Sequence, residues 1–425
     1  MDVSKSKTNN CPPVPLPDSC SAWNDDKEPN ITNNTDIYLF DGFNDNKYQE
    51  NPFFVDDLNN INTLTDSDKV KIKIISESFH NKLTYGELKR LGISNLGFVT
   101  DDIRRLLWPK ILKIRDIELI ERNEELKMIN SKIPHNIYQQ ILNDVSRSGS
   151  HLMPNASEAE IIKFHDELTK MICWVLVRHP NLNYYQGYND VAATVLIVMG
   201  LKSGLYILEK ISLEFLERFM EKTMEKVNQE LFYIFALLER VHPTLLEHLE
   251  NVELFPHFAL AEYTTWYAHK YSENRKLLHR LFDFFLGSPP LMPLYVSTVI
   301  VAHRATEIFN TTPDMGHTHK VLCTLPLDLP IEDLLSNATK LYNNYPPESI
   351  GKDVYEYDRK RHKKEQEWKL KAIASRKERE KQCQLKVAVP RHRLAYHLKS
   401  YRTITVVTIL AIGLYAFIKT GSGLN

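Results

Sequence analysis

The chain has 425 residues, 43% of them hydrophobic and 25% charged, which is the balance of a globular protein with a substantial core. Its 14 glycines are too few for a turn-rich β architecture, and its five cysteines lack the pairing pattern of a disulfide scaffold. The formal net charge of −1 conceals an acidic N-terminal region and a basic stretch from Arg359 to Lys381, so it says little about partners.

Residues 1–65 are rich in Asn, Asp and Pro and show no sustained hydrophobic period. This composition predicts a disordered lead-in. The N-terminus carries no signal-peptide pattern, and scattered cysteines fit a reducing compartment. These two features predict that the main domain of the chain is cytosolic.

Residues 66–345 show apolar side chains at helical intervals, with no alternating strand pattern. Two short helices are expected on either side of a turn at 95–97, and amphipathic helices are expected at 138–145 and 161–176. The run 191–200 is apolar on all sides, which predicts a buried core helix too short to cross a bilayer. The prediction is an all-α domain of many helices.

Residues 346–402 form a charged region, and an apolar run at 403–419 follows it. About sixteen helical residues span roughly 24 Å, so this run would suit a thin membrane such as that of the early secretory pathway. The preceding basic residues would stay in the cytosol. We expect a transmembrane tail anchor; a buried or interfacial C-terminal helix is the alternative. For the basic stretch, contact with anionic lipid or plain solvation is expected in preference to nucleic-acid binding.

The segment Ile141-Leu-Asn-Asp144-Val-Ser-Arg147 places a carboxylate and an arginine at i,i+3 near a helix exit. Asp144 can pair with Arg147 and orient it toward an anion. The same pattern also describes an ordinary surface ion pair.

A second segment, Tyr184-Tyr-Gln186-Gly187, lies between two strong helix patterns. It can be read as a simple connection with Asn189 as the N-cap of the next helix. That interpretation leaves unexplained why aromatic residues surround an uncharged amide. Gln186 can hydrogen-bond both a water and a phosphate oxygen, and Gly187 lets the backbone approach a partner closely.

Hydrolysis of GTP by small GTPases needs an arginine that neutralises developing charge and a glutamine that positions the attacking water. The chain lacks the G-x-x-x-x-G-K-[ST] phosphate loop, so any GTP would belong to a partner.

The chain resembles the TBC-domain Rab GTPase-activating proteins, most closely their membrane-anchored branch. The resemblance runs from about residue 88 to about 345. It rests on the two segments above, on Asp102-Ile-Arg-Arg105-Leu-Leu-Trp108-Pro109, and on similarity between residues 266 and 293.

This resemblance implies that Arg147 is an arginine finger and Gln186 a glutamine finger, both supplied in trans. Asp144 would orient Arg147, and Tyr184 and Gly187 would shape the glutamine loop.

The resemblance also implies that Arg105 and Trp108 are structural, holding the first helix of the domain against the core. It implies no cofactor of the chain's own, because GTP and Mg belong to the partner. That partner would be a GTP-bound early-secretory Rab acting between the endoplasmic reticulum and the Golgi, where the chain would be anchored.

Two other functions are compatible with the residues. The chain could be a catalytically silent Rab-binding membrane scaffold that keeps the fold without accelerating hydrolysis. It could also be a metal-dependent enzyme using His317, His319 and Cys323, but their spacing matches no common zinc site, so no metal is expected.

Overall fold

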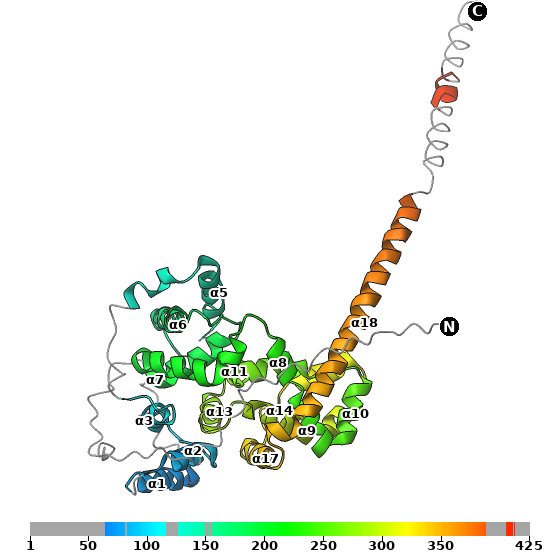
Figure 1. Cartoon of the computed structure of the whole chain (residues 1–425). Helices are drawn as coiled ribbons and strands as arrows, with labels where there is room; N and C mark the ends of the chain where they lie inside the picture. Colours follow the sequence, from blue (N-terminus) through cyan, green and yellow to red (C-terminus); the bar gives the residue numbers. More distant parts are fainter. Residues whose placement is uncertain are drawn as a thin grey trace, which may run out of the picture. The chain divides into compact units, whose positions relative to one another are not determined.

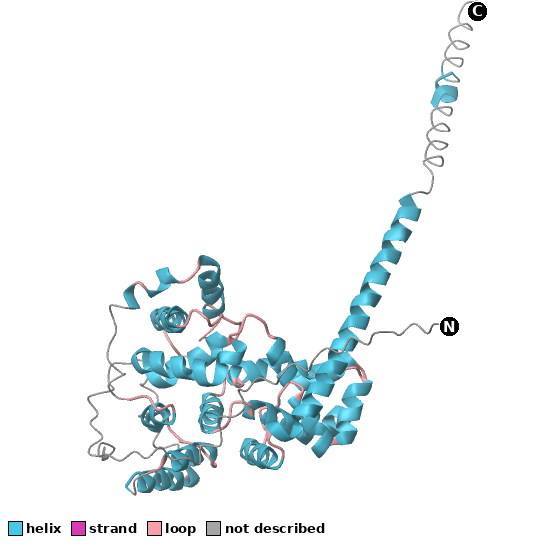
Figure 2. Ribbon diagram, viewed as in Figure 1, coloured by secondary structure: helices cyan, strands magenta, loops and turns pink. Residues whose placement is uncertain are grey.

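The computed structural model describes residues 64–80, 83–115, 126–148, 153, 155–387, 405–410 and 412. Over these ranges the chain is helical and contains no strand, which confirms the predicted all-α class (Figures 1 and 2). The predicted lead-in, apart from its last two residues, lies outside the described residues. So does most of the predicted membrane span at 403–419.

The helices begin where local sequence provides a cap. Both α2 and α6 start at capping boxes, Thr84 with Glu87 and Ser157 with Glu160, in which each side chain satisfies a backbone N–H of the other. In chain order the helices are α1 (Asp66–His80), α2 (Tyr85–Ile93), α3 (Asp101–Ile111), η6 (Ile129–Lys132), α5 (His135–Val145), α6 (Glu158–Arg178), α7 (Tyr188–Ile211), η7 (Ser212–Leu216), η8 (Glu217–Phe219), α8 (Glu225–Glu230), α9 (Tyr233–Val241), α10 (Pro243–Asn251), η9 (Pro256–Ala259), α11 (Leu260–Thr265), α12 (Ala268–Tyr271), α13 (Arg275–Gly287), α14 (Met292–His303), α15 (Ala305–Phe309), α16 (Met315–Cys323), α17 (Ile331–Asn344) and α18 (Pro347–Val387).

Helix α7 is the centre of the domain. Figure 1 shows α5, α6, α7 and α3 stacked in succession, and each neighbouring pair is in contact. Because α7 has neighbours on several sides, it is apolar all round. The continuous helical segment Tyr188–Phe219 is the one helix of the described residues that is long and apolar enough to span a membrane, and 83% of its apolar window is buried in the protein.

The predicted core helix at 191–200 is therefore confirmed as buried, and its expected end at Gly200 coincides with a break in the helical backbone. Gly200 has the non-helical angles φ 68° and ψ 170°, so α7 consists of two helical segments joined at a kink. A glycine tolerates this positive φ at no steric cost. The sequence signal for an end at Gly200 thus marks a kink inside α7.

A buried carboxylate of α13 binds several donors of α3 and the turn before it. Asp283, with no exposed surface, accepts hydrogen bonds from Arg104 Nη2 at 2.9 Å and from Trp108 Nε1 at 2.8 Å. The resemblance had assigned the structural role to Arg105. That arginine pairs with Asp102 on its own helix, and its Nε donates to the Val198 carbonyl of α7 at 2.8 Å, a contact between α3 and the core that is compatible with the structural role. Arg104, which is 3% exposed, forms the buried ion pair with Asp283.

The compact unit continues to Asp358, beyond the domain boundary expected at 345. The reason is that the first turns of α18 supply core side chains. The Tyr357 ring stacks on Phe232 with centroids 6.4 Å apart and meets the edge of Phe235 at 5.9 Å. In the second unit, which begins at Arg359, α18 runs on to Val387, and its side chains are exposed from 366 to 382. This part of the charged region is a solvated helix.

Candidate functional site

The guanidinium of Arg147 lies in the turn that follows α5. Helix α5 ends at Val145, and Arg147 Nη2 forms an ion pair with Asp144 Oδ1. Arg147 Nε also donates to the Asn143 carbonyl at 3.2 Å. The Arg147 side chain is 67% exposed and the Asp144 side chain 6%. The arginine is therefore fixed through a buried carboxylate while its charged end remains open to solvent.

Tyr184 connects the second segment to the first. Its hydroxyl donates to Asp144 Oδ2 at 3.0 Å, so the two carboxylate oxygens serve Arg147 and Tyr184 separately. Burial raises the pKa of the Tyr184 hydroxyl, and the neighbouring charge of Asp144 raises it further. The hydroxyl thus stays protonated and remains a donor to Asp144.

Gln186 is exposed, and its side chain makes no hydrogen bond to any residue that the structure describes. The residues beside it are fixed. The Tyr185 hydroxyl donates to the Thr264 carbonyl at 2.8 Å, and Tyr185 is 7% exposed. The amide of Gln186 is therefore free to bind another molecule, while the backbone that carries it is held by the core.

Gly187 is the N-cap of α7, so the prediction of Asn189 as the N-cap was wrong. The glycine has φ 99°, and Asn189 reaches back from the first turn so that its Oδ1 accepts the Gly187 N–H at 3.2 Å. A Cβ on Gly187 would lie 2.8 Å from Thr265 Cγ2. Both the backbone conformation and the space around it require glycine here.

Replacement of Gly187 by alanine is expected to lower the free energy of unfolding by about 1–2 kcal/mol, because the positive φ strains any Cβ. Contact with Thr265 adds to this cost. Gly86→Ala is the matched control: it lies in α2 with nothing within 4 Å of the new Cβ, and helix propensity predicts a stability gain of up to about 1 kcal/mol. Denaturant unfolding of both variants checks the opposite signs; equal stability would contradict the assignment.

The two segments meet through a second contact as well. Asn189 Nδ2 donates to Ser148 Oγ at 2.9 Å, and both residues are 7% exposed. The exposed Arg147 and Gln186 thus lie on two turns that are joined by the buried residues Ser148 and Asn189. Such a pair can present a cation and a neutral amide to one anionic group carried by another molecule.

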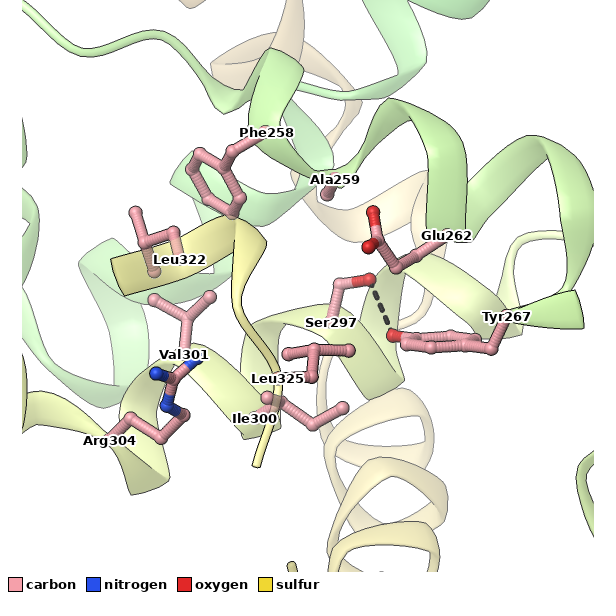
Figure 3. Close-up of a pocket in the computed structure, with 10 residues that line it drawn as sticks. All are labelled: Phe258, Ala259, Glu262, Tyr267, Ser297, Ile300, Val301, Arg304, Leu322 and Leu325. Carbon is pink, nitrogen blue, oxygen red and sulfur yellow. Dashed lines mark hydrogen bonds between the residues drawn. The ribbon is translucent and has the colours of Figure 1, made fainter. Parts of the chain in front are cut away.

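Two hollows of the described domain are lined by other residues than Arg147 and Gln186. Figure 3 shows a cavity between η9, α11, α14 and α16, where the hydroxyls of Tyr267 and Ser297 face each other at 2.8 Å. Its volume of about 20 Å³ is enough for one water molecule and too small for an organic ligand. A wider groove of about 310 Å³ between η6, α5 and α6 includes Ser146, the residue before Arg147.

The three residues considered for a metal lie on α16, where each has a protein contact. The His317 ring nitrogen Nδ1 lies 2.6 Å from Asp314 Oδ2. The Cys323 thiol lies 3.6 Å from His319 Nε2 and 3.8 Å from the Phe258 carbonyl. Each of the three side chains thus has a contact within α16 or with a residue next to it.

Sequence reasoning missed the residues that join the segments. Ser148 and Asn189 are 41 positions apart, and Arg104 and Asp283 are 179 apart. No local spacing connects such pairs. For Arg104 alone a signal existed, since it lies one full turn of helix before the buried Trp108.

Comparison with known proteins gives three findings. Residues 101–309 match the sequence model of the Rab-GTPase-TBC domain. The chain is 35% identical over 289 residues to TBC1 domain family member 20 of Homo sapiens, a match that covers 67% of this chain and 70% of that protein. It is 28% identical to the GTPase-activating protein gyp10 of Schizosaccharomyces pombe, over 63% of this chain and 71% of gyp10.

Among solved structures, a RabGAP TBC domain from the Chlamydomonas flagellum has a similar fold, with a TM-score of 0.50 at 12% sequence identity. The similarity covers 64% of this chain and 92% of that chain.

Proposed function

The chain belongs to the Rab-GTPase-TBC domain family, and from this premise we propose that it accelerates GTP hydrolysis by a Rab through Arg147 and Gln186. Both side chains act in trans on nucleotide held by the partner. Arg147 neutralises charge that develops on the transferred phosphoryl group, and Gln186 positions the attacking water. GTP and Mg²⁺ are supplied by the Rab.

One observation carries this proposal: the ends of both side chains are exposed while their bases share one buried network. Asp144 binds Arg147 and Tyr184 at the same time, which fixes the arginine relative to the glutamine loop. Catalysis by charge stabilisation depends on such preorganisation, because groups already in place need no rearrangement in the transition state. A silent Rab-binding scaffold would not require this arrangement.

The test is a single-turnover hydrolysis assay with the full chain in detergent and a panel of GTP-loaded Rabs. Acceleration of γ-phosphate release for at least one Rab is the expected result. If the chain binds GTP-loaded Rabs but accelerates none of them, the scaffold function replaces the proposed one.

We further propose that the Rab and the membrane belong to the early secretory pathway, between the endoplasmic reticulum and the Golgi. In support, the apolar run at 403–419 is short for a bilayer with a hydrocarbon core of about 30 Å. The main domain then faces the cytosol, where Rabs are found. In the hydrolysis panel, the largest acceleration is expected for an early-secretory Rab.

The run 403–419 is proposed as a tail anchor. In support, residues 405–410 are helical, and the apolar side chains described there are 56–67% exposed. These side chains are Val406, Val407, Ile409, Leu410 and Ile412. A helix with apolar residues exposed on all sides is stable in hydrocarbon, because its backbone polar groups bond internally and its side chains leave water.

Removal of this run is expected to release the protein from membranes. The full chain should stay in the membrane pellet after alkaline carbonate washing, and a chain ending at His397 should move to the supernatant. Val407→Lys/Leu410→Lys in the full chain should also weaken retention, since each charge near the bilayer centre costs about 2.5–3.5 kcal/mol. If the chain ending at His397 remains in the pellet, another segment is responsible for membrane binding.

A further inference from the structure

Asn189 contacts the residue that follows each of the two fingers. Its Oδ1 accepts the backbone N–H of Gly187, which follows Gln186, at 3.2 Å. Its Nδ2 donates at 2.9 Å to the hydroxyl of Ser148, which follows Arg147. The backbone N–H can only donate, so it fixes the orientation of the amide. One buried side chain therefore connects both finger turns directly.

Ser148 is itself fixed from two further directions. Its hydroxyl donates to the Asp144 carbonyl at 3.1 Å, which leaves its lone pairs to accept from Asn189. Its carbonyl accepts from His165 Nε2 of α6 at 2.8 Å. The turn that carries Arg147 is thus attached to α6 through His165 and to α7 through Asn189.

The remaining donor capacity of Asn189 goes to Asp190. Nδ2 lies 2.8 Å from Asp190 Oδ1, so the amide is satisfied at both ends. A buried amide with all of these partners has a single low-energy orientation, because any rotation leaves a polar group unpaired. This makes Asn189 a rigid link between the two turns.

We propose that Asn189 is a positioning residue that sets the placement of Arg147 relative to Gln186, an inference that rests on the proposed function. In this role Asn189 acts on the two fingers through Gly187 and Ser148. The ion pair of Asp144 with Arg147 orients the end of the arginine. Asn189 sets the distance between the two turns that carry the fingers.

Asn189→Ala is expected to lower the kcat of stimulated hydrolysis about 10- to 100-fold with little change in KM for the Rab. The reason is that a displacement of about 1 Å of a reacting group costs on the order of 10²-fold in rate. Ser148→Ala should reduce kcat in the same way. Because both variants break the same link, the double variant should be much less than multiplicatively impaired.

Asn183→Ala is the matched control. This asparagine lies in the same connection, three residues before Gln186, but its Nδ2 donates to the Met220 carbonyl at 3.1 Å and contacts neither finger turn. Its kcat should match that of the unaltered chain. Ser148→Thr keeps the hydroxyl that accepts from Asn189 and should retain more activity than Ser148→Ala.

All variants are compared as full chains, with the Rab that the unaltered chain accelerates most, and thermal unfolding is measured alongside. Asn189→Ala should unfold at a lower temperature than Asn183→Ala, because it leaves buried partners of the amide unpaired, so rates are compared at a temperature where every variant is fully folded. A positioning role lowers the kcat of the folded Asn189→Ala protein at that temperature. An unchanged kcat, or a loss of rate that follows a general loss of stability, overturns it.

Hydrogen exchange separates this proposal from the proposed function. In Asn189→Ala, backbone amides of both finger turns, around Arg147 and around Gln186, should exchange faster, and in Asn183→Ala the turn around Arg147 should not. If the unaltered chain accelerates no Rab, the proposed function fails, and the exchange experiment still decides whether Asn189 links the turns. Faster exchange in only one turn overturns the link.

Discussion

Arg147→Ala is expected to lower the stimulated rate of GTP hydrolysis by about 10³- to 10⁵-fold, the contribution typical of an arginine supplied in trans. The ion pair with Asp144 keeps the guanidinium oriented before the partner arrives, so the unaltered side chain needs no rearrangement. Gln186→Ala should also remove most of the stimulation, because the attacking water loses its hydrogen-bond partner. Single-turnover release of γ-phosphate measures both effects.

The rate losses caused by Arg147→Ala and Gln186→Ala should not multiply in the double variant. Arginine and glutamine act on the same transition state, so Arg147→Ala/Gln186→Ala should be only slightly slower than the worse single variant. Binding to the GTP-loaded Rab should change far less than the rate. This difference separates a catalytic role from a role in docking alone.

Two matched controls test whether position matters more than residue type. Gln140→Ala removes an exposed glutamine on α5, and Arg376→Ala removes an exposed arginine that pairs with Glu380 on its own helix at 3.1 Å. Both should keep the rate of the unaltered chain. Near-normal rates for Arg147→Ala and Gln186→Ala as well would rule out the two-finger mechanism.

Asp283→Ala is expected to be among the most destabilising single changes in the domain, lowering the free energy of unfolding by about 3–5 kcal/mol. The substitution leaves Arg104 without its principal counter-ion in the interior. It also removes the acceptor for the Phe98 N–H at 3.0 Å and for Trp108 Nε1 at 2.8 Å. A buried donor without a partner destabilises the fold, because it has lost its hydrogen bonds to water and gained none in the protein.

Denaturant unfolding checks this value. The double variant Arg104→Met/Asp283→Ala should be less destabilised than the sum of its single variants, because the two residues form one ion pair and removing both leaves neither of them unpaired. Part of the cost should remain, since Asp101 loses its bond from Arg104 and keeps His279. Asp166→Ala is the control: its pair with Lys170 is exposed, and its loss should cost no more than about 0.5 kcal/mol. A cost below 1 kcal/mol for Asp283→Ala would show that this carboxylate is not a principal link between α3 and α13.

Local patterns in the sequence predicted most of the fold. The apolar stripes at 138–145 and 161–176 correspond to α5 and α6, and the turn at 95–97 separates α2 from α3. These predictions succeed because helix periodicity and capping depend on neighbours within four residues. The core helix predicted to end near Gly200 reaches a kink at that residue, and a second helical segment of α7 follows it.

The sequence by itself also identified the chemical groups of the candidate site: Asp144 and Arg147 at i,i+3, and Gln186 beside glycine in an aromatic loop. Only the tertiary structure decided how these groups are held. The bond from Tyr184 to Asp144 spans 40 positions. It exists because α6 folds back between α5 and α7, and no local pattern encodes that approach.

The partners of Arg104 and Arg105 illustrate the same limit of sequence-based prediction. Adjacent residues on a helix point about 100° apart, so the two arginines meet different neighbours, and the sequence does not say which ones. Packing of α3 against α13 places Asp283 beside Arg104 and leaves Arg105 to the Val198 carbonyl. The sequence determined which helices form and which side chains could do chemistry. Long-range packing determined which of them meet, because burial and pairing depend on residues far away in the chain.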